Sequence, residues 1–137
     1  MLPETNNHTR TQILQLTTSL DNSLAVRSIA SSSQVIKEKI GESLVYAPVG
    51  RELSYFKRWG AKIINKEVKS SSIPNNKTVI KELTNIINEY GIKIVHSHDL
   101  NALKIAQVIQ KYLDIKILYS QTEDLLQKSI FKLQNIL

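Results

Sequence analysis

Two histidines and an aspartate stand together in the segment His96–Asp99, which follows an apolar run and precedes a helical pattern. Residues i and i+2 of an extended chain point to the same side, so His96 and His98 are expected to present their imidazoles together. Such a pair can transfer protons, form hydrogen bonds with a substrate or bind a metal ion. The alternative is structural: Asp99 caps the helix that follows, and the histidines only orient the turn.

A metal-dependent hydrolase is one interpretation of the His-x-His pattern, and it needs further ligands. The chain has three histidines and no cysteine, and the third histidine, His8, lies in a polar N-terminal stretch. A third ligand would have to be a carboxylate, for which Asp21 and Asp124 are the candidates at the same edge of the predicted sheet. We therefore expect no bound metal, and we keep a hydrolase built on His96 and His98 as an alternative.

Apolar runs and amphipathic patterns alternate strictly along the chain. Five apolar runs predict strands at Ile13–Leu16, Leu44–Ala47, Ala61–Ile64, Ile92–Val95 and Ile115–Tyr119. Helices are predicted over Leu24–Lys39, Arg51–Trp59, Val79–Tyr90, Ala102–Leu113 and 123–137. Their expected N-caps, where the sequence offers one, are Asn22 or Ser23, Asn76 or Thr78, Asp99, and Thr122. This alternation implies α/β class: a Rossmann-like doubly wound parallel sheet of about five strands, ordered 3-2-1-4-5, with helices on both faces.

Ligands of open α/β sheets bind outside the carboxyl ends of the strands. Four predicted turns reach that edge, namely Thr17–Ser23, Pro48–Arg51, His96–Asp99 and Ser120–Asp124. The first turn contains no glycine, which a dinucleotide-binding turn needs where the backbone approaches the pyrophosphate. Gly41, Gly60 and Gly91 each follow a predicted helix, where a left-handed residue often ends it. The sequence therefore argues against NAD or FAD, although the hydroxyls of the first turn can hold a sugar or a phosphate.

The formal charge of +6 comes from 18 lysines and arginines against 12 aspartates and glutamates. Acidic residues interleave with the lysines, as in Lys37-Glu38 and Lys66-Glu67, so no basic cluster indicates a nucleic-acid partner. No run approaches the roughly 20 apolar residues of a membrane span, and Met1–Arg10 lacks the apolar core of a secretory signal. Without cysteine the chain has no disulfide framework. We expect a cytoplasmic protein that binds no nucleic acid.

We expect residues 1–9 to form a flexible terminus and residues 10–137 to form a single domain. The last predicted helix is apolar on the face that carries Leu126, Ile130, Leu133 and Leu137. Because no later segment covers this face, the domain is expected to be incomplete at its C-terminal end. The Leu126–Leu137 face is then expected to pack against a separate chain or a second copy.

The order of these features resembles the N-terminal domain of glycosyltransferase family 4, the group 1 glycosyltransferases, over about Thr11–Gln121. Ile13–Leu16 and the turn after it look like the family's first strand and substrate loop. Gly50–Leu53 and Trp59–Ile64 resemble its small loop, short helix, glycine and strand. Leu83–Gly91 followed by Ile92–Asp99 is similar to its helix leading into His-x-His, and Ala102–Ile109 and Ile115–Gln121 continue the likeness.

The resemblance implies the N-terminal half of a GT-B fold, which binds the acceptor. A second domain would bind the nucleotide-sugar donor, and transfer would retain the anomeric configuration without a metal. The resemblance also implies cell-envelope polysaccharide biosynthesis in the cytoplasm, with a sugar or lipid-linked acceptor. The basic charge favours contact with the inner face of the membrane. The acceptor-binding residues implied are His96, His98 and Asp99, with Asn22, Ser23 and Gln121 opposite.

The chain departs from the family pattern in three places. The family's Gly-Gly-x-Glu after the first strand is replaced by Asn22–Ala25, and its later Thr-x-His ends here in Gln121. A glutamine can form hydrogen bonds with a sugar but cannot become charged. The donor domain has no counterpart in the 137 residues. We therefore expect little or no transferase activity from this polypeptide alone. The alternative is a non-catalytic remnant or interaction domain that pairs with a separate donor-domain chain.

Overall fold

Strands and helices alternate along the whole of the described chain. The computed structural model describes residues 12–19, 23–48, 52–64 and 75–120. The strands are β1 Gln12–Leu16, β2 Ser43–Tyr46, β3 Ala61–Ile63, β4 Ile92–Ser97 and β5 Lys116–Tyr119. The helices are α2 Ser23–Lys39, α3 Glu52–Arg58, α4 Asn76–Tyr90 and α5 Leu100–Gln110. All four strand pairings are parallel and the order is β3-β2-β1-β4-β5, which confirms the predicted fold class and topology.

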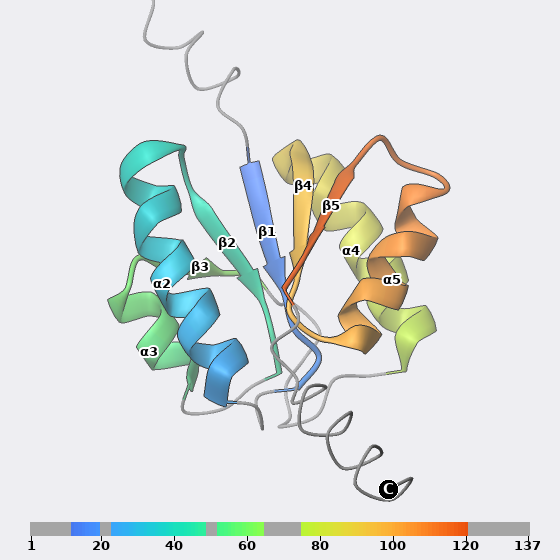
Figure 1. Ribbon diagram of the computed structural model, residues 1–137. Coiled ribbons are helices and arrows are strands. Elements are labelled where there is room, and N and C mark those ends of the chain that lie inside the picture. The colour runs from blue at the N-terminus through green and yellow to red at the C-terminus, as the bar shows by residue number, and fades with distance from the viewer. Residues whose placement is uncertain (1–11, 20–22, 49–51, 65–74, 121–137) are drawn as a thin grey trace, which may run out of the picture.

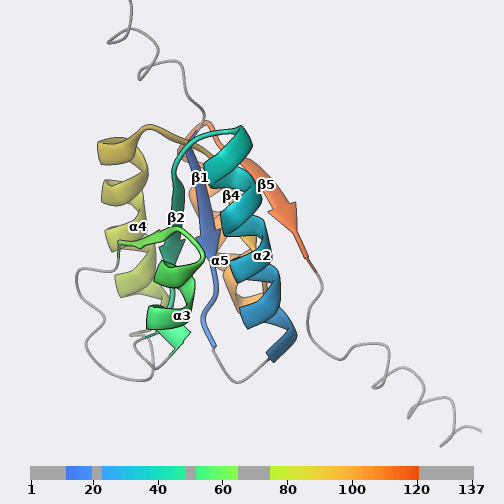
Figure 2. The same ribbon diagram turned by 90° about the vertical axis from the view of Figure 1, so that its left-hand side faces the viewer.

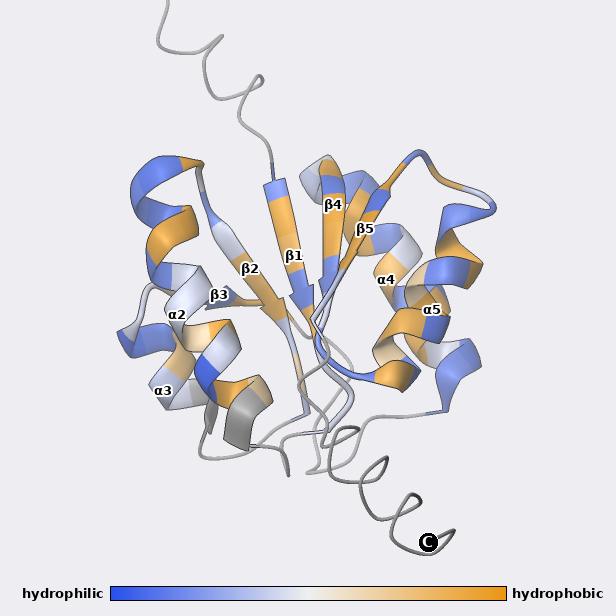
Figure 3. Cartoon of the chain, viewed as in Figure 1, coloured by the Kyte–Doolittle hydropathy of each residue, from blue (hydrophilic) through white to orange (hydrophobic). Residues whose placement is uncertain are grey.

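The sheet lies between two helical layers. α2 and α3 lie against one face and α4 and α5 against the other, as the elements of Figure 1 show. Figure 2 shows α2 and α4 on opposite sides of the strands. A right-handed crossover from one parallel strand to the next explains this arrangement, because the chain leaves β1 in one direction and returns past it in the other. In Figure 3 β1, β2 and β4 are mostly apolar along their middles, whereas β3 and β5 also carry polar residues. The helices are two-sided in hydropathy, since each helix buries one side only.

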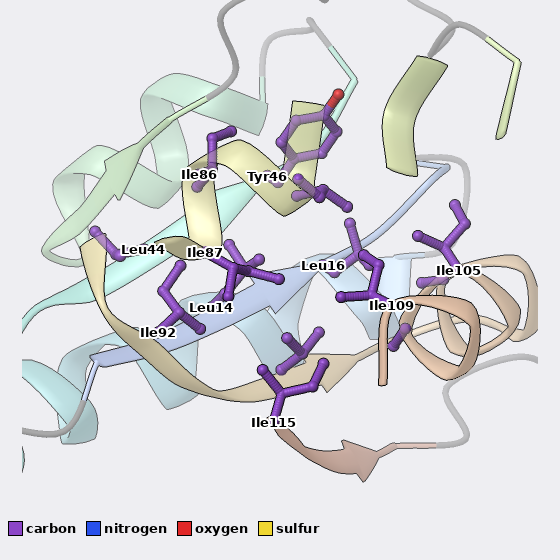
Figure 4. Packing of buried hydrophobic residues seen from close by; sticks show 14 of the residues in the cluster. Leu14, Leu16, Leu44, Tyr46, Ile86, Ile87, Ile92, Ile105, Ile109 and Ile115 are labelled. Atoms are coloured by element: carbon purple, nitrogen blue, oxygen red, sulfur yellow. The ribbon is translucent and has the colours of Figure 1, made fainter. Parts of the chain in front are cut away.

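The larger hydrophobic core lies between the sheet and the layer of α4 and α5. Leu14 and Leu16 of β1 are fully buried there, against isoleucines of both helices. Figure 4 shows this packing, with Ile86 and Ile87 from α4 and Ile109 from α5 around the central strand. Alternate β2 residues turn to the other face, where a smaller cluster includes Val45, Phe56 and Ile29. The strand residues near the site are therefore held by packing on both faces.

Helix ends follow the expected chemistry with small shifts. The side chain of Asn75 caps α4 by accepting a hydrogen bond from the Thr78 N–H at 3.0 Å, so the prediction of Asn76 or Thr78 was wrong. Asn75 has non-helical backbone angles, which an N-cap needs, whereas Asn76 is already helical. Gly60 and Gly91 have positive φ, as predicted. Gly41 does not have a positive φ. At the end of α2 the N–H groups of Ile40 and Gly41 both donate to the Ile36 carbonyl.

β4 is two residues longer than the apolar run predicted. His96 pairs with Leu118 and Ser97 with Tyr119, so the parallel ladder continues to Ser97. The first of the two histidines is therefore held by strand hydrogen bonds rather than by a turn. α2 also continues across its serine cluster, because the buried Ser33 hydroxyl contacts side chains of the sheet. The predicted flexible terminus and final helix lie outside the described residues, and the domain boundaries stay predictions.

Candidate functional site at the carboxyl end of the sheet

His96 and His98 meet at the carboxyl end of β4. Their ring centroids lie 4.1 Å apart with planes tilted by 32°, which confirms that the two imidazoles share one side of the chain. β4 fixes His96 through its ladder with β1 and β5. The N–H of His98 donates to the Leu16 carbonyl at 3.0 Å, which extends the pairing by one residue. The backbone of both histidines is thus held by hydrogen bonds to neighbouring strands.

His98 is completely buried, and its partner is Gln15 of β1. The His98 Nε2 lies 2.8 Å from the Gln15 Oε1. The Gln15 amide nitrogen lies within 3.0 Å of the Ser33 hydroxyl and 3.2 Å of the Ile29 carbonyl, both in α2. Gln15 is itself fully buried, and the sequence reasoning missed it. The available signal was a single polar residue inside the apolar run Ile13–Leu16.

Asp99 fastens the loop after β1 to the start of α5. One carboxylate oxygen accepts hydrogen bonds from the Thr17 hydroxyl at 2.9 Å and the Thr18 N–H at 2.7 Å. The other oxygen accepts from the Thr18 hydroxyl at 2.8 Å and the Ala102 N–H at 2.7 Å. The last contact confirms that Asp99 caps α5. These four short hydrogen bonds from groups of the protein occupy the acceptor positions of the Asp99 carboxylate.

His96 is the histidine of the pair that reaches the surface. It is partly exposed, and its Nε2 lies 2.7 Å from the Ser120 hydroxyl. Its Nδ1 has no hydrogen bond to the described part of the chain. A ligand at this edge can therefore reach one ring nitrogen whose orientation β4 and Ser120 fix. Contacts of a ligand with His98 and Asp99 stay a prediction, since both are buried here.

Burial keeps both rings uncharged near neutral pH. Loss of hydration lowers the pKa of His96. Burial, and then the neighbouring His96, lower the pKa of His98 to about 3. Two like-charged rings in contact would repel, which acts in the same direction as desolvation. The pair therefore offers dipolar hydrogen-bonding groups rather than positive charge, and His98 is too weakly basic to take up a proton at neutral pH.

Comparisons with known proteins support the fold. No protein-family model and no curated protein sequence matches the chain. A glycosyltransferase from Rickettsia africae ESF-5 has a similar structure, with a TM-score of 0.69 and 17% identity over 83% of this chain. The likeness spans 30% of that glycosyltransferase chain. A universal stress protein in complex with cAMP is also similar, with a TM-score of 0.52 and 10% identity over 84% of this chain and 100% of that one. At these identities the likeness shows a glycosyltransferase-like α/β fold.

Several residues named from the sequence cannot be placed at the site. Asn22 and Gln121 lie outside the described residues, and Ser23 is placed only as the first residue of α2. Asp21 and Asp124, the possible further metal ligands, also lie outside them. Within the described ranges no three histidine, cysteine, aspartate or glutamate side chains gather as a metal site would require. In the same ranges no helix is long and apolar enough to cross a membrane.

A hollow of about 720 Å³ lies at the opposite edge of the sheet. Its lining includes Lys37 from the end of α2 and Gly41, Gly60 and Ala61 near the amino ends of β2 and β3. A smaller hollow of about 400 Å³ shares Lys37 and Gly60 with it. Lys37 and Lys57 in this lining belong to the last turns of α2 and α3, where cations stabilise the negative end of the helix dipole. This edge carries no side chain of the candidate site.

Proposed function

We propose that this chain is the acceptor-binding part of a glycosyltransferase of the GT-B type, similar to family 4. The observation that carries the proposal is the uncharged ring of His96 at the carboxyl end of a parallel sheet, with an Nδ1 that has no hydrogen bond to the described residues. A glycosyltransferase with the same fold in part of its chain supports it. Ligands of such sheets bind at this edge.

Within this proposal His96 contacts a hydroxyl of the acceptor. A sugar hydroxyl can donate to or accept from a neutral imidazole nitrogen, so either tautomer of His96 serves. Ser120 holds the other nitrogen and so limits rotation of the ring. His98 and Asp99 fix the floor and the adjoining loop, and Asn22, Ser23 and Gln121 are proposed on the opposite side. The donor nucleotide-sugar belongs to a second domain, whether in the same or a separate chain.

The proposal extends to where the chain works. A sugar or lipid-linked acceptor, a cytoplasmic location and contact with the inner face of a membrane agree with the net charge of +6. A role in cell-envelope polysaccharide synthesis and retention of configuration follow from the family resemblance. A homodimer or a donor-domain partner would use the Leu126–Leu137 face, which lies outside the described residues.

Nucleotide binding is a second candidate, favoured by the likeness to the whole length of a universal stress protein structure that contains cAMP. The first turn of this chain lacks glycine, which disfavours close approach of a phosphate to the backbone. A His96–His98 metal hydrolase has less support, because His98 directs its Nε2 to Gln15. Ligation through that nitrogen would break a buried hydrogen bond.

Titration of the isotope-labelled chain, followed by nuclear magnetic resonance, tests the proposal. The probes are methyl glycosides, a short isoprenyl diphosphate-linked sugar, UDP-glucose and cAMP. We expect the first two to shift the His96 ring signals and UDP-glucose and cAMP to leave them unchanged. His96→Ala should abolish the shifts that the glycosides cause in the backbone amide signal of Ser120, which lies beside His96. Tyr112→Ala should leave those shifts unchanged, because Tyr112 is 79% exposed beyond the far end of α5. Preferential binding of cAMP at His96 would favour the nucleotide alternative, and no response to any glycoside would refute the proposal.

A further inference from the structure

Gln15 has only one orientation that satisfies its surroundings. Its amide faces the Ile29 carbonyl on one side and the His98 ring on the other. A carbonyl oxygen can only accept, so the NH₂ group of Gln15 must face Ile29. The opposite orientation would set two buried acceptor oxygens against each other, which is costly. The Oε1 of Gln15 therefore faces His98.

The orientation of Gln15 fixes the proton on His98. An amide oxygen cannot donate, so the ring nitrogen 2.8 Å from it must carry the hydrogen. His98 is then the Nε2–H tautomer, and the Nδ1 keeps its lone pair. Protonating the ring would place a charge in a fully buried position, beside His96. The Asp99 carboxylate could offset such a charge, but it is bound to Thr17, Thr18 and the start of α5.

The protonation state of His98 affects His96, which is the partly exposed ring of the pair. The two rings are in contact at 4.1 Å, and His96 is the partly exposed one. A neutral His98 leaves no opposite charge to hold a proton on His96. Ser43 closes the network behind Gln15, with its hydroxyl 3.0 Å from Ser33 and 3.4 Å from the Gln15 amide nitrogen. Hydrogen bonds and the ring contact thus link Ser33 of α2 through Gln15 of β1 to the histidine pair at the end of β4.

We propose that Gln15 is a positioning residue that holds His98 as the neutral Nε2–H tautomer, so that the histidine pair receives an uncharged hydroxyl group rather than an anion. Only the part of the inference that concerns the ligand rests on the proposed function. Within it, the acceptor group at His96 is a sugar hydroxyl, and any phosphate of a lipid-linked acceptor lies away from the pair. Gln15 touches no ligand and acts through His98.

Long-range proton–nitrogen spectra of the imidazoles test the role of Gln15 without any ligand. In the native chain we expect the Nε2–H pattern for His98 and neutral rings for both histidines at pH 7. Gln15→Glu places a carboxylate against the ring and should raise the pKa of His98 by about 1 to 3 pH units. Ser43→Ala is the matched control, since it removes the 3.0 Å bond to Ser33 and the 3.4 Å contact with Gln15 and leaves the Gln15–His98 bond intact. It should not change the tautomer.

An Nδ1–H tautomer, or a His98 that titrates near 6.5 in the native chain, would overturn the inference. Should Gln15→Glu fail to fold, the tautomer and the titration of the native chain still decide it.

Ligand selectivity is read separately, with methyl glycoside and inorganic phosphate as probes. We expect only the glycoside to shift the His96 signals, with less than about twofold change in Kd when sodium chloride is raised, because no charge is screened. Phosphate binding at His96 would overturn the hydroxyl preference. Absence of glycoside binding with the expected tautomer would refute the proposed function and leave the role of Gln15 intact.

Discussion

Removing the Asp99 carboxylate is expected to destabilise the fold more than the loss of a helix cap. An Asp N-cap replaced by alanine usually costs about 1 kcal/mol. Asp99 also holds Thr17 and Thr18 of the loop after β1 through three further hydrogen bonds. Each hydrogen bond to a charged group contributes about 1.5 to 3 kcal/mol. The Thr18 groups are partly exposed and can turn to water, so only part of this is lost.

Counting the cap and one further charged hydrogen bond gives about 2.5 to 4 kcal/mol for Asp99→Ala. Asp99→Asn retains one acceptor oxygen and should lose about half as much. Thr18→Val removes only the 2.8 Å bond from its hydroxyl and should cost about 1 kcal/mol. Domains of this kind have about 5 to 15 kcal/mol of total stability, so the variants should still fold.

Urea unfolding followed by circular dichroism and by Trp59 fluorescence measures these differences. With a denaturant slope of about 2 kcal/mol per molar urea, Asp99→Ala should lower the midpoint by about 1.2 to 2 M. Coinciding transitions of the two probes would justify two-state values. Asp114→Ala is the matched control, because it removes the same charge from an exposed position and should change stability by less than about 0.5 kcal/mol. A loss for Asp99→Ala within about 1 kcal/mol of this control would refute the reasoning.

Three further changes test other parts of the structure. Burial lowers the pKa of His98 to about 3 in the folded chain, against 6.5 for an unburied ring. Above pH 6.5 the ring is neutral in both the folded and the unfolded chain, so its burial does not reduce the free energy of unfolding. This free energy should fall by about 1.4 kcal/mol per pH unit toward pH 3, a slope that His98→Gln should reduce in urea titrations at several pH values. Tyr46→Phe removes the 2.6 Å bond to the buried Glu82 carboxylate and should cost about 1.5 to 3 kcal/mol by chemical denaturation, more than Glu82→Gln; equal costs would contradict this. Gly60→Ala should lower the melting temperature more than Gly91→Ala, because its φ of 95° lies beyond the left-handed helical region and its added Cβ would lie 2.7 Å from a lysine carbon.

Local patterns were sufficient to predict the fold. Strand-length apolar runs and amphipathic helices depend on neighbouring residues only, and Asp99 stands where a cap must stand. The errors at Asn75 and Gly41 are errors of one residue or one dihedral angle, which side-chain types do not determine. The alternation then led to the order 3-2-1-4-5, because right-handed crossovers leave few alternatives.

The internal connections of the site could not be predicted in the same way. Gln15 and His98 are 83 residues apart, and Thr17 and Asp99 are 82 apart. Their contacts depend on the register between β1 and β4, which shifts by a bulge between Gln12 and Ile13. Neither the bulge nor the register has a sequence signal here. The paired histidines were visible from the sequence, but the reason that one of them is buried lies in another strand.

The position of β1 at the centre of the sheet has a consequence for synthesis of the chain. β1 is made first, and its β4 partner follows about 80 residues later, as the 82-residue separation of Thr17 and Asp99 shows. Ribosomes add about 5 to 20 residues per second, so one edge of β1 waits about 4 to 16 s for its ladder. During that time a nascent chain carries an apolar, unpaired strand edge, which invites aggregation. The fold is therefore expected to form late and cooperatively, and to depend on chaperones or slow dilution when the chain is produced at high concentration.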